Sequence, residues 1–477
     1  MYSKQARFTS LKSQQAFSFA GKAFTKSITL ALLMLSLNAC STSYVREYIE
    51  EEGGKSGNWV QVHNGKETKI VAKQVDGPIV MNDAETDVLA FPANASIFVS
   101  IEGDENLEMD IKRQGRSDTQ VDYKVDGVKR SREQMTDAQL KTLWQHFFRR
   151  SGLSIEERSA RIFKNEGLEG LFTEITQLQS NAVTRRYLSN LSQNYEMNEG
   201  QFDKALQIIA DISSNSESSR AYKSILEGKT TLSEAQLVTL IEQSSTISSN
   251  STLSNLLSDM LDMDIPAAQA SDGRLNKSFT EALLKASTEI SSGSQLASFL
   301  ESIIEKVDDQ DVLASVIVVA KDNISSDSTL SSLYEEISEM KLSESNVRLL
   351  VDSAAQEIAS DSTLADLFDE INETDLSEAN VRLLIESAGA EIASDSTLSE
   401  LYEEINERDL STENARLLIR TASNRIASDS KLTSLLIEIA NSKNYSPALL
   451  DDLMEASKSI GSSSQREKLL EVLVVLK

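Results

Sequence analysis

The stretch Ile358-Ala-Ser-Asp-Ser-Thr-Leu364 decides the fold of this chain because it recurs at a nearly fixed interval. It returns almost unchanged at 392–398 and 426–432. Nine copies, several of them degenerate, each place one residue at the position of Asp361: Asn181, Asn215, Asn250, Gly293, Asp327, Asp361, Asp395, Asp429 and Ser463. Successive copies lie 34 residues apart, except for two intervals of 35 and 43. A period in this range predicts a stacked array of supersecondary units.

Each unit is predicted to be two helices joined by a tight turn. In one unit, Ser343 caps a first helix whose apolar stripe follows helical spacing, at Val347, Leu350, Val351, Ala354 and Ile358. The serines and the aspartate of 359–362 favour a turn and a new helix start. The second stripe is Leu364, Leu367, Phe368 and Ile371. Because one hairpin cannot bury its own stripe, stacked neighbours must share a core. We therefore predict a mostly α protein in which 166–477 form an α-solenoid of about nine 34-residue hairpins.

The type of repeat is less well defined by the sequence than its existence. The period equals that of tetratricopeptide repeats, but the Trp, Gly, Tyr and Pro landmarks of that family are missing. The pattern therefore favours a HEAT-like array over a TPR-like one. The interval of 43 leaves an insertion near 262–277, which we expect to be a bend, a binding loop or a tolerated surface insertion.

The first 40 residues resemble a bacterial lipoprotein signal. Five basic residues and no acidic ones precede the apolar run 27–37, which is too short to span a bilayer comfortably. Leu37-Asn38-Ala39-Cys40 follows at once. The resemblance implies cleavage of 1–39 and lipidation of Cys40, and Ser41 favours the outer membrane. We expect anchoring on the periplasmic side, with surface exposure or a secretory signal with a chance cysteine as alternatives.

The region before the repeats is predicted to hold a small antiparallel β domain. Residues 40–57 are polar and read as a tether. In 58–132, apolar residues alternate with others at 97–101, 107–111 and 121–125, which indicates five to seven half-buried strands. Asp76-Gly77 and Asp126-Gly127 suit hairpin turns. Residues 133–165 form a helical connector, in which Thr136 caps one helix and Ser154, with Glu157, starts a second through a capping box.

Composition limits the classes of partner. The chain has 477 residues and a formal net charge of −27, so it should be repelled by nucleic acid and anionic lipid heads. Its single cysteine excludes an intrachain disulfide and cysteine-based zinc sites. The two histidines, His63 and His146, fall in different predicted domains. With no catalytic motif present, we expect no enzyme activity, no cofactor and no metal, and keep a hydrolase in the β domain as an alternative.

Three sets of charged residues are candidates for binding a protein partner. The first is a ladder at spacing 34, formed by Arg348, Arg382 and Arg416, of which the first two can pair with Asp352 and Glu386. The second is an acidic stripe: Glu335, Glu336, Asp369, Glu370, Glu403 and Glu404. The third is a basic cluster: Arg149, Arg150, Arg158, Arg161, Arg185 and Arg186. A solvated helix surface is the plain alternative for all three.

The chain resembles bacterial envelope proteins with Ser-Asp-centred helical repeats, which are sometimes extensions of BlaR-type metallopeptidase sensors. The residues that carry the likeness are 122–128, Trp144, Gly152, 157–158, 161–162, 167–171 and 185–188, beside the repeats themselves. No His-Glu-x-x-His is present, so no catalytic residue is carried over. The resemblance implies a protein-binding scaffold or adaptor in envelope maintenance or stress sensing. An accessory factor for outer-membrane or cell-wall assembly enzymes is the alternative.

Overall fold

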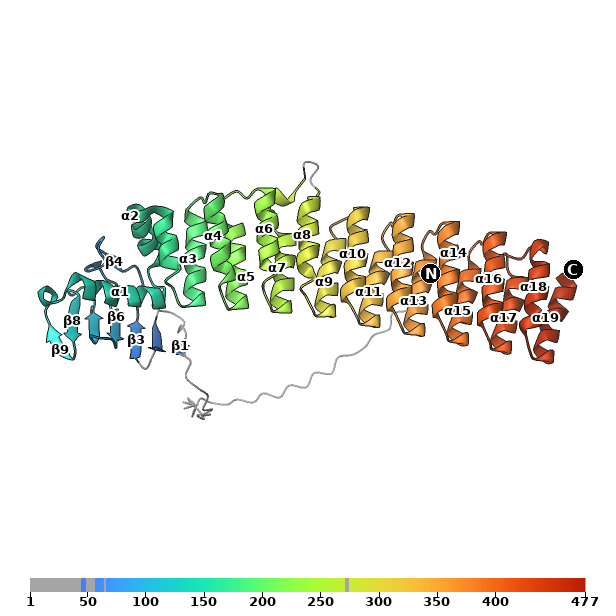
Figure 1. Ribbon diagram of the computed structural model, residues 1–477, viewed down its shortest axis with the longest axis horizontal. Helices are drawn as coiled ribbons and strands as arrows, with labels where there is room; N and C mark the ends of the chain where they lie inside the picture. Colours follow the sequence, from blue (N-terminus) through green and yellow to red (C-terminus); the bar gives the residue numbers. More distant parts are fainter. Residues whose placement is uncertain (1–43, 49–55, 64–65, 271–273, 477) are drawn as a thin grey trace, which may run out of the picture.

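A computed structural model describes residues 44–48, 56–63, 66–270 and 274–476. A β-sheet covered by helix α1 lies at one end of the molecule, and an elongated array of helix hairpins extends from it to the C-terminus (Figure 1). The chain is thus an α-solenoid preceded by a small antiparallel β domain, as predicted. Cys40 and the rest of the signal lie outside the described residues.

Seven antiparallel strands form the main sheet, in the order β1-β2-β3-β6-β7-β8-β9. Their bounds are β1 (Tyr44–Tyr48), β2 (Gly57–His63), β3 (Lys66–Lys73), β6 (Ser96–Ile101), β7 (Leu107–Lys112), β8 (Gln120–Val125) and β9 (Val128–Arg130). The main sheet alone has as many strands as the upper end of the prediction, but its first strand lies before the predicted region 58–132. The tether at 40–57 is wrong in part, because β1 lies inside it and pairs with β2 along its whole length.

The predicted alternation places apolar residues on one face of the sheet. Ile70, Val99, Met109 and Tyr123 follow one another across β3, β6, β7 and β8 in register. All four are buried. Helix α1 (Asp137–Ser151) covers them with a further list of buried residues, Leu140, Leu143, Trp144, Phe147 and Phe148. Helix α1 therefore belongs to the core of the β domain and is not a free connector.

Only one of the two turn dipeptides joins a hairpin. Asp126 and Gly127, both with positive φ, connect β8 to β9. Asp76-Gly77 instead lies in the segment that connects β3 to β6, because β3 pairs with β6 and not with the next strand in the chain. That segment carries a separate two-stranded hairpin, β4 (Val80–Met81) with β5 (Val88–Ala90).

The start of helix α2 (Ile155–Ile175) differs from the predicted capping box. Thr136 caps α1 as expected, but Ser154 adopts a left-handed conformation with φ 55° and its side chain caps nothing. Its hydroxyl accepts a hydrogen bond from the backbone N–H of Ile79 at 2.9 Å. Helix α2 is interrupted at Gly167, whose φ is 67°. Its apolar residues join the solenoid core, so the predicted connector is divided between the two domains.

The remaining helices form hairpins that stack in two rows, even-numbered in one and odd-numbered in the other (Figure 1). Their bounds are α3 (Asn181–Asn194), α4 (Glu199–Ala210), α5 (Asn215–Leu226), α6 (Glu234–Ser244), α7 (Asn250–Asp262), α8 (Lys277–Ser287), α9 (Gly293–Ile304), α10 (Gln310–Asn323), α11 (Asp327–Ser338), α12 (Glu344–Glu357), α13 (Asp361–Glu373), α14 (Glu378–Glu391), α15 (Asp395–Glu407), α16 (Thr412–Arg425), α17 (Asp429–Asn441), α18 (Leu450–Ala456) and α19 (Ser463–Leu476). With α2, they make nine hairpins in the described chain.

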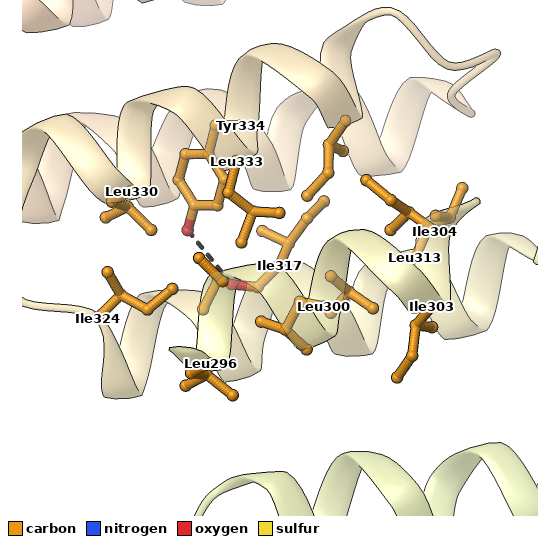
Figure 2. Packing of buried hydrophobic residues seen from close by; sticks show 14 of the residues in the cluster. Leu296, Leu300, Ile303, Ile304, Leu313, Ile317, Ile324, Leu330, Leu333 and Tyr334 are labelled. Carbon is orange, nitrogen blue, oxygen red and sulfur yellow. Dashed lines mark hydrogen bonds between the residues drawn. The ribbon is translucent and has the colours of Figure 1, made fainter. Parts of the chain in front are cut away.

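One continuous apolar core runs through the stack from Ile155 to Leu473. Figure 2 shows part of it, where Leu300 of α9, Ile317 of α10 and Leu333 of α11 pack together. Each such side chain contributes about 1.5–3 kcal/mol when it is fully buried. The insertion before α8 is anchored by a short 3₁₀ helix, Pro266–Ala268, whose Ala268 is buried.

Candidate binding surfaces

The recurring phrase marks the start of the odd-numbered helix in every hairpin. All nine residues at the Asp361 position are the first residue of a helix, from α3 to α19. The serine before them is the N-cap, as in Ser360, whose hydroxyl accepts from the backbone N–H of Thr363. The predicted capping bond is confirmed for seven of the nine serines, while the side chains of Ser214 and Ser292 make no such bond.

The aspartate of the phrase has a different role, which the sequence did not reveal. The carboxylate of Asp327 accepts a hydrogen bond of 2.8 Å from the backbone N–H of Ser360, which lies in the corresponding turn of the next repeat. Asp361 accepts from Ser394 at 2.7 Å, and Asp395 from Ser428 at 2.7 Å. The asparagines bond the residue one position before the corresponding serine: Asn215 and Asn250 accept from the backbone N–H groups of Ser248 and Ser291, and Asn181 donates to the Ser213 hydroxyl. We call the whole series the turn ladder: Asn181, Asn215, Asn250, Asp327, Asp361, Asp395 and Asp429. It fixes the spacing between successive repeats.

The acidic stripe predicted from the sequence exists and is longer than expected. Positions eight, nine and twelve residues after each phrase position share one exposed face of the odd-numbered helices. We call this face the acidic band: Glu301, Glu305, Glu335, Glu336, Glu339, Asp369, Glu370, Glu373, Glu403, Glu404, Glu407 and Glu438. No ion pair among the described residues involves any of the twelve. The nearby pair joins Lys431 to Glu400, outside the band.

Repulsion between neighbouring helices shows that the band is continuous. Partial burial, followed by the charges of Glu373 and Glu335, raises the pKa of Glu370. Partial burial and the charge of Asp369 on the preceding odd-numbered helix raise the pKa of Glu404. Carboxylates of three successive repeats therefore lie within electrostatic reach of one another. This concentration of negative charge suits a cationic ligand.

The arginine ladder lies on the even-numbered helices, in the other row. Arg382 pairs with Glu386 at 3.1 Å, as predicted. Arg348 makes no such ion pair within the described chain. Arg416 instead pairs with Asp452 of α18 at 2.8 Å, and this ion pair joins two adjacent repeats. The three arginines thus differ in how accessible they are to a partner. Arg348 and Arg382 are exposed, whereas Arg416 is half-buried.

The basic cluster is largely an internal ion network and not an open patch. Arg158 of α2 is 1% exposed. Its guanidinium bonds Glu85 at 2.7 Å and Glu174 at 2.6 Å. Arg149 donates two hydrogen bonds of 2.8 Å to the same Glu174 carboxylate. The prediction of Arg149 as a surface contact is therefore wrong, because its partner is buried inside the protein.

The rest of the cluster is also occupied. Arg161 pairs with Glu85, and Arg185 pairs with Glu217 at 2.9 Å. Arg150 donates to Gln179 at 2.7 Å, and burial lowers the pKa of Arg150. These contacts tie α1, α2 and the β4–β5 hairpin to the first repeats, so the cluster is a joint between the two domains.

The joint keeps its carboxylates ionised. Burial alone would raise the pKa of Glu85, but the hydrogen bonds and charges of Arg158 and Arg161 outweigh it and lower that pKa. Glu174 behaves in the same way, through Arg149 and Arg158. A polar cavity of about 200 Å³ beside the network is lined by four acidic and four basic side chains. Its charges are balanced, which gives it no preference for an ion of either sign.

Both histidines lie within the part of the chain that the structure describes. The described residues contain no group of three or more His, Cys, Asp or Glu side chains that could hold a metal ion. Burial, together with the charges of Arg150 and Arg149, lowers the pKa of His146 to about 4, so this histidine is neutral at physiological pH. His63 lies on β2. Within the described part of the chain, no helix has the length and apolar character needed to cross a membrane.

Comparisons with known proteins do not assign the chain to a family. No protein-family model matches the chain, and no curated protein matches it significantly. One similar solved structure is described as a computationally designed self-assembling cyclic homo-oligomer, with 10% identity, a TM-score of 0.12, and coverage of 68% of this chain and 97% of that one. Another is a circular tandem repeat protein, with 15% identity, a TM-score of 0.15, and coverage of 70% and 71%.

Proposed function

We propose that this protein is a non-enzymatic scaffold of the bacterial envelope that binds a protein partner along its solenoid. The observation that carries the proposal is the stack of nine hairpins, whose turn ladder holds successive repeats at a fixed spacing. Such arrays present extended surfaces that a compact domain cannot offer. The lipoprotein-like signal ending at Cys40 supports attachment to the outer membrane through a lipid, with the β domain near the anchor.

The acidic band is the surface that we propose contacts the partner. Its twelve carboxylates make no ion pair within the described chain, and partial burial together with neighbouring carboxylates raises the pKa values of Glu370 and Glu404. A basic protein segment would relieve that repulsion and release counterions. The partner is therefore expected to present lysines or arginines along an extended or helical segment.

Charge reversal within the band tests the proposal in the full-length protein. The variant carries Glu336→Lys, Glu370→Lys and Glu404→Lys. A matched control carries Asp322→Lys, Glu357→Lys and Glu391→Lys, which change the charge equally on exposed positions of the even-numbered helices.

Photo-crosslinking from positions in the band then identifies the bound proteins in cells. We expect specific basic partners to be captured by the wild type and the control but lost from the band variant, while all three keep the same circular dichroism spectrum. An identical partner set for all three proteins would contradict the role of the band. Capture of no specific protein from any exposed solenoid position would contradict the scaffold function itself.

A further inference from the structure

One interface in the solenoid lacks the bond that all the other turns make. Eight interfaces separate the nine phrase positions, and at seven of them the first residue of the odd-numbered helix bonds the next turn through its side chain. The exception is Gly293 of α9, which has no side chain to offer. The backbone N–H of Ser326, which corresponds to that of Ser360, has no acceptor among the described residues.

On the even-numbered helices, a second series of side-chain bonds begins only after the same interface in the described chain. Asn346, Asn380 and Asn414 are buried at the third position of α12, α14 and α16. Each donates from its side-chain amide to a backbone carbonyl at the start of the preceding even-numbered helix, at 2.8, 3.3 and 3.0 Å. Helix α10 has Val312 at this position, so no amide reaches α8. The turn ladder is therefore interrupted between hairpins α8–α9 and α10–α11, and the amide series begins only beyond this interface.

What remains at this interface is mainly apolar packing. Figure 2 shows Leu296, Leu300 and Ile303 of α9 beside residues of α10 and α11. Two exposed ion pairs join the starts of α8 and α10, Lys277 with Asp311 at 3.1 Å and Arg274 with Asp308 at 3.9 Å, and exposed pairs contribute little. Burial and then the charge of Glu336 raise the pKa of Glu301, which means that the two helices also repel one another here.

We infer that the interface between α8–α9 and α10–α11 is a hinge, about which two stiffer arms of the solenoid rotate. Apolar contacts are non-directional, so side chains can slide by small amounts without losing their burial. Hydrogen bonds to backbone N–H groups resist such sliding because they depend on distance and angle. The motion goes beyond the proposed function, since a hinge at this place would act whatever the arms bind.

Hydrogen exchange measured on the full-length protein tests the local part of the inference. After correction for intrinsic rates, the amide of Ser326 should exchange about tenfold faster than those of Ser360, Ser394 and Ser428, because it lacks a charge-assisted bond. Gly293→Asp should restore the bond and slow Ser326 to the rate of the others. A Cβ at Gly293 would lie 3.5 Å from Ile324, which is ordinary contact. Ser294→Asp adds the same charge at an exposed neighbour and should leave Ser326 fast.

Spin-label distances test the motion itself, in a Cys40→Ser background. Labels at Ser298 and Asp366 span the hinge, and labels at Asp366 and Ser434 span two laddered interfaces at the same repeat separation and on equivalent exposed positions. We expect a broader distance distribution across the hinge, narrowed by Gly293→Asp. Equal widths for the two pairs would overturn the hinge. Slow exchange at Ser326 in the wild type would contradict the missing hydrogen bond as the cause of the hinge.

Discussion

The turn ladder predicts that one carboxylate stabilises a neighbouring repeat. Asp395 accepts two backbone bonds from the next turn, from Ala427 at 3.0 Å and from Ser428 at 2.7 Å. A hydrogen bond to a charged group contributes about 1.5–3 kcal/mol. Because Asp395 is half-buried, water would replace part of both bonds after its removal. We therefore expect Asp395→Ala to lower the free energy of unfolding by about 2 kcal/mol.

An internal comparison sets the expectation for the neutral analogue. Asn215 accepts from the backbone N–H of Ser248, the counterpart of Ala427, at 3.2 Å, which is longer than the 3.0 Å bond from Ala427 to Asp395. Asp395→Asn should therefore keep a weaker acceptor and lose about 1 kcal/mol. Ser396→Ala is the control, since Ser396 is exposed on the same turn, and it should change stability by less than about 0.5 kcal/mol.

Urea unfolding followed by far-UV circular dichroism measures these losses. Hydrogen exchange locates them, and the amides of Ala427 and Ser428 should be the ones that lose protection. The reasoning would be refuted by an Asp395→Ala protein as stable as the Ser396→Ala control, or by unchanged exchange at this turn.

Three further predictions concern packing and pH. Gly389→Ala should destabilise the protein by about 1–3 kcal/mol, although alanine usually favours a helix, because its Cβ would lie 2.3 Å from Thr421 Cγ2 and 2.6 Å from the Tyr402 hydroxyl; urea unfolding measures this, and Thr421→Ser should recover part of the loss. Arg158→Met should cost about 3–5 kcal/mol by leaving two buried carboxylates without their shared partner, seen as a lower Tm; an unchanged Tm would show that the joint is not stabilising. In the acidic band, a folded-state pKa raised above its ordinary value means that ionisation opposes folding, so thermal stability should rise as the pH falls from 7 toward about 5, and Glu370→Gln should raise Tm at pH 7 and weaken that pH dependence.

Local signals in the sequence were enough to predict the helix starts of the solenoid. The serine that precedes Asp361 caps a helix through atoms only three residues away, so its role can be inferred from spacing alone. The role of Asp361 cannot, because its partner Ser394 is brought near only when two repeats stack. One signal was present: the phrase keeps an Asp or Asn immediately after a serine that already serves as the cap.

The burial of the basic cluster could not be predicted from the sequence, because its contacts join residues that are far apart in the chain. Arg158 and its partner Glu85 are separated by 73 residues and belong to different elements. The capping-box prediction at Ser154 fails for a related reason. The Ser154 hydroxyl accepts a hydrogen bond from the backbone N–H of Ile79 and does not cap α2. The strand β1 was missed because the polar residues around it resemble a linker. In each case a distant segment decided the outcome.

The turn ladder has a direction, and that direction bears on how the protein is made. Every aspartate of the ladder lies earlier in the chain than the N–H groups that it binds, as with Asp429 and the later Gly461 and Ser462. During synthesis from the N-terminus, each new turn therefore emerges after the carboxylate or amide that will hold it. A hairpin can dock on the finished end of the growing rod without waiting for the rest of the chain. Assembly can proceed as addition to a template, one repeat at a time.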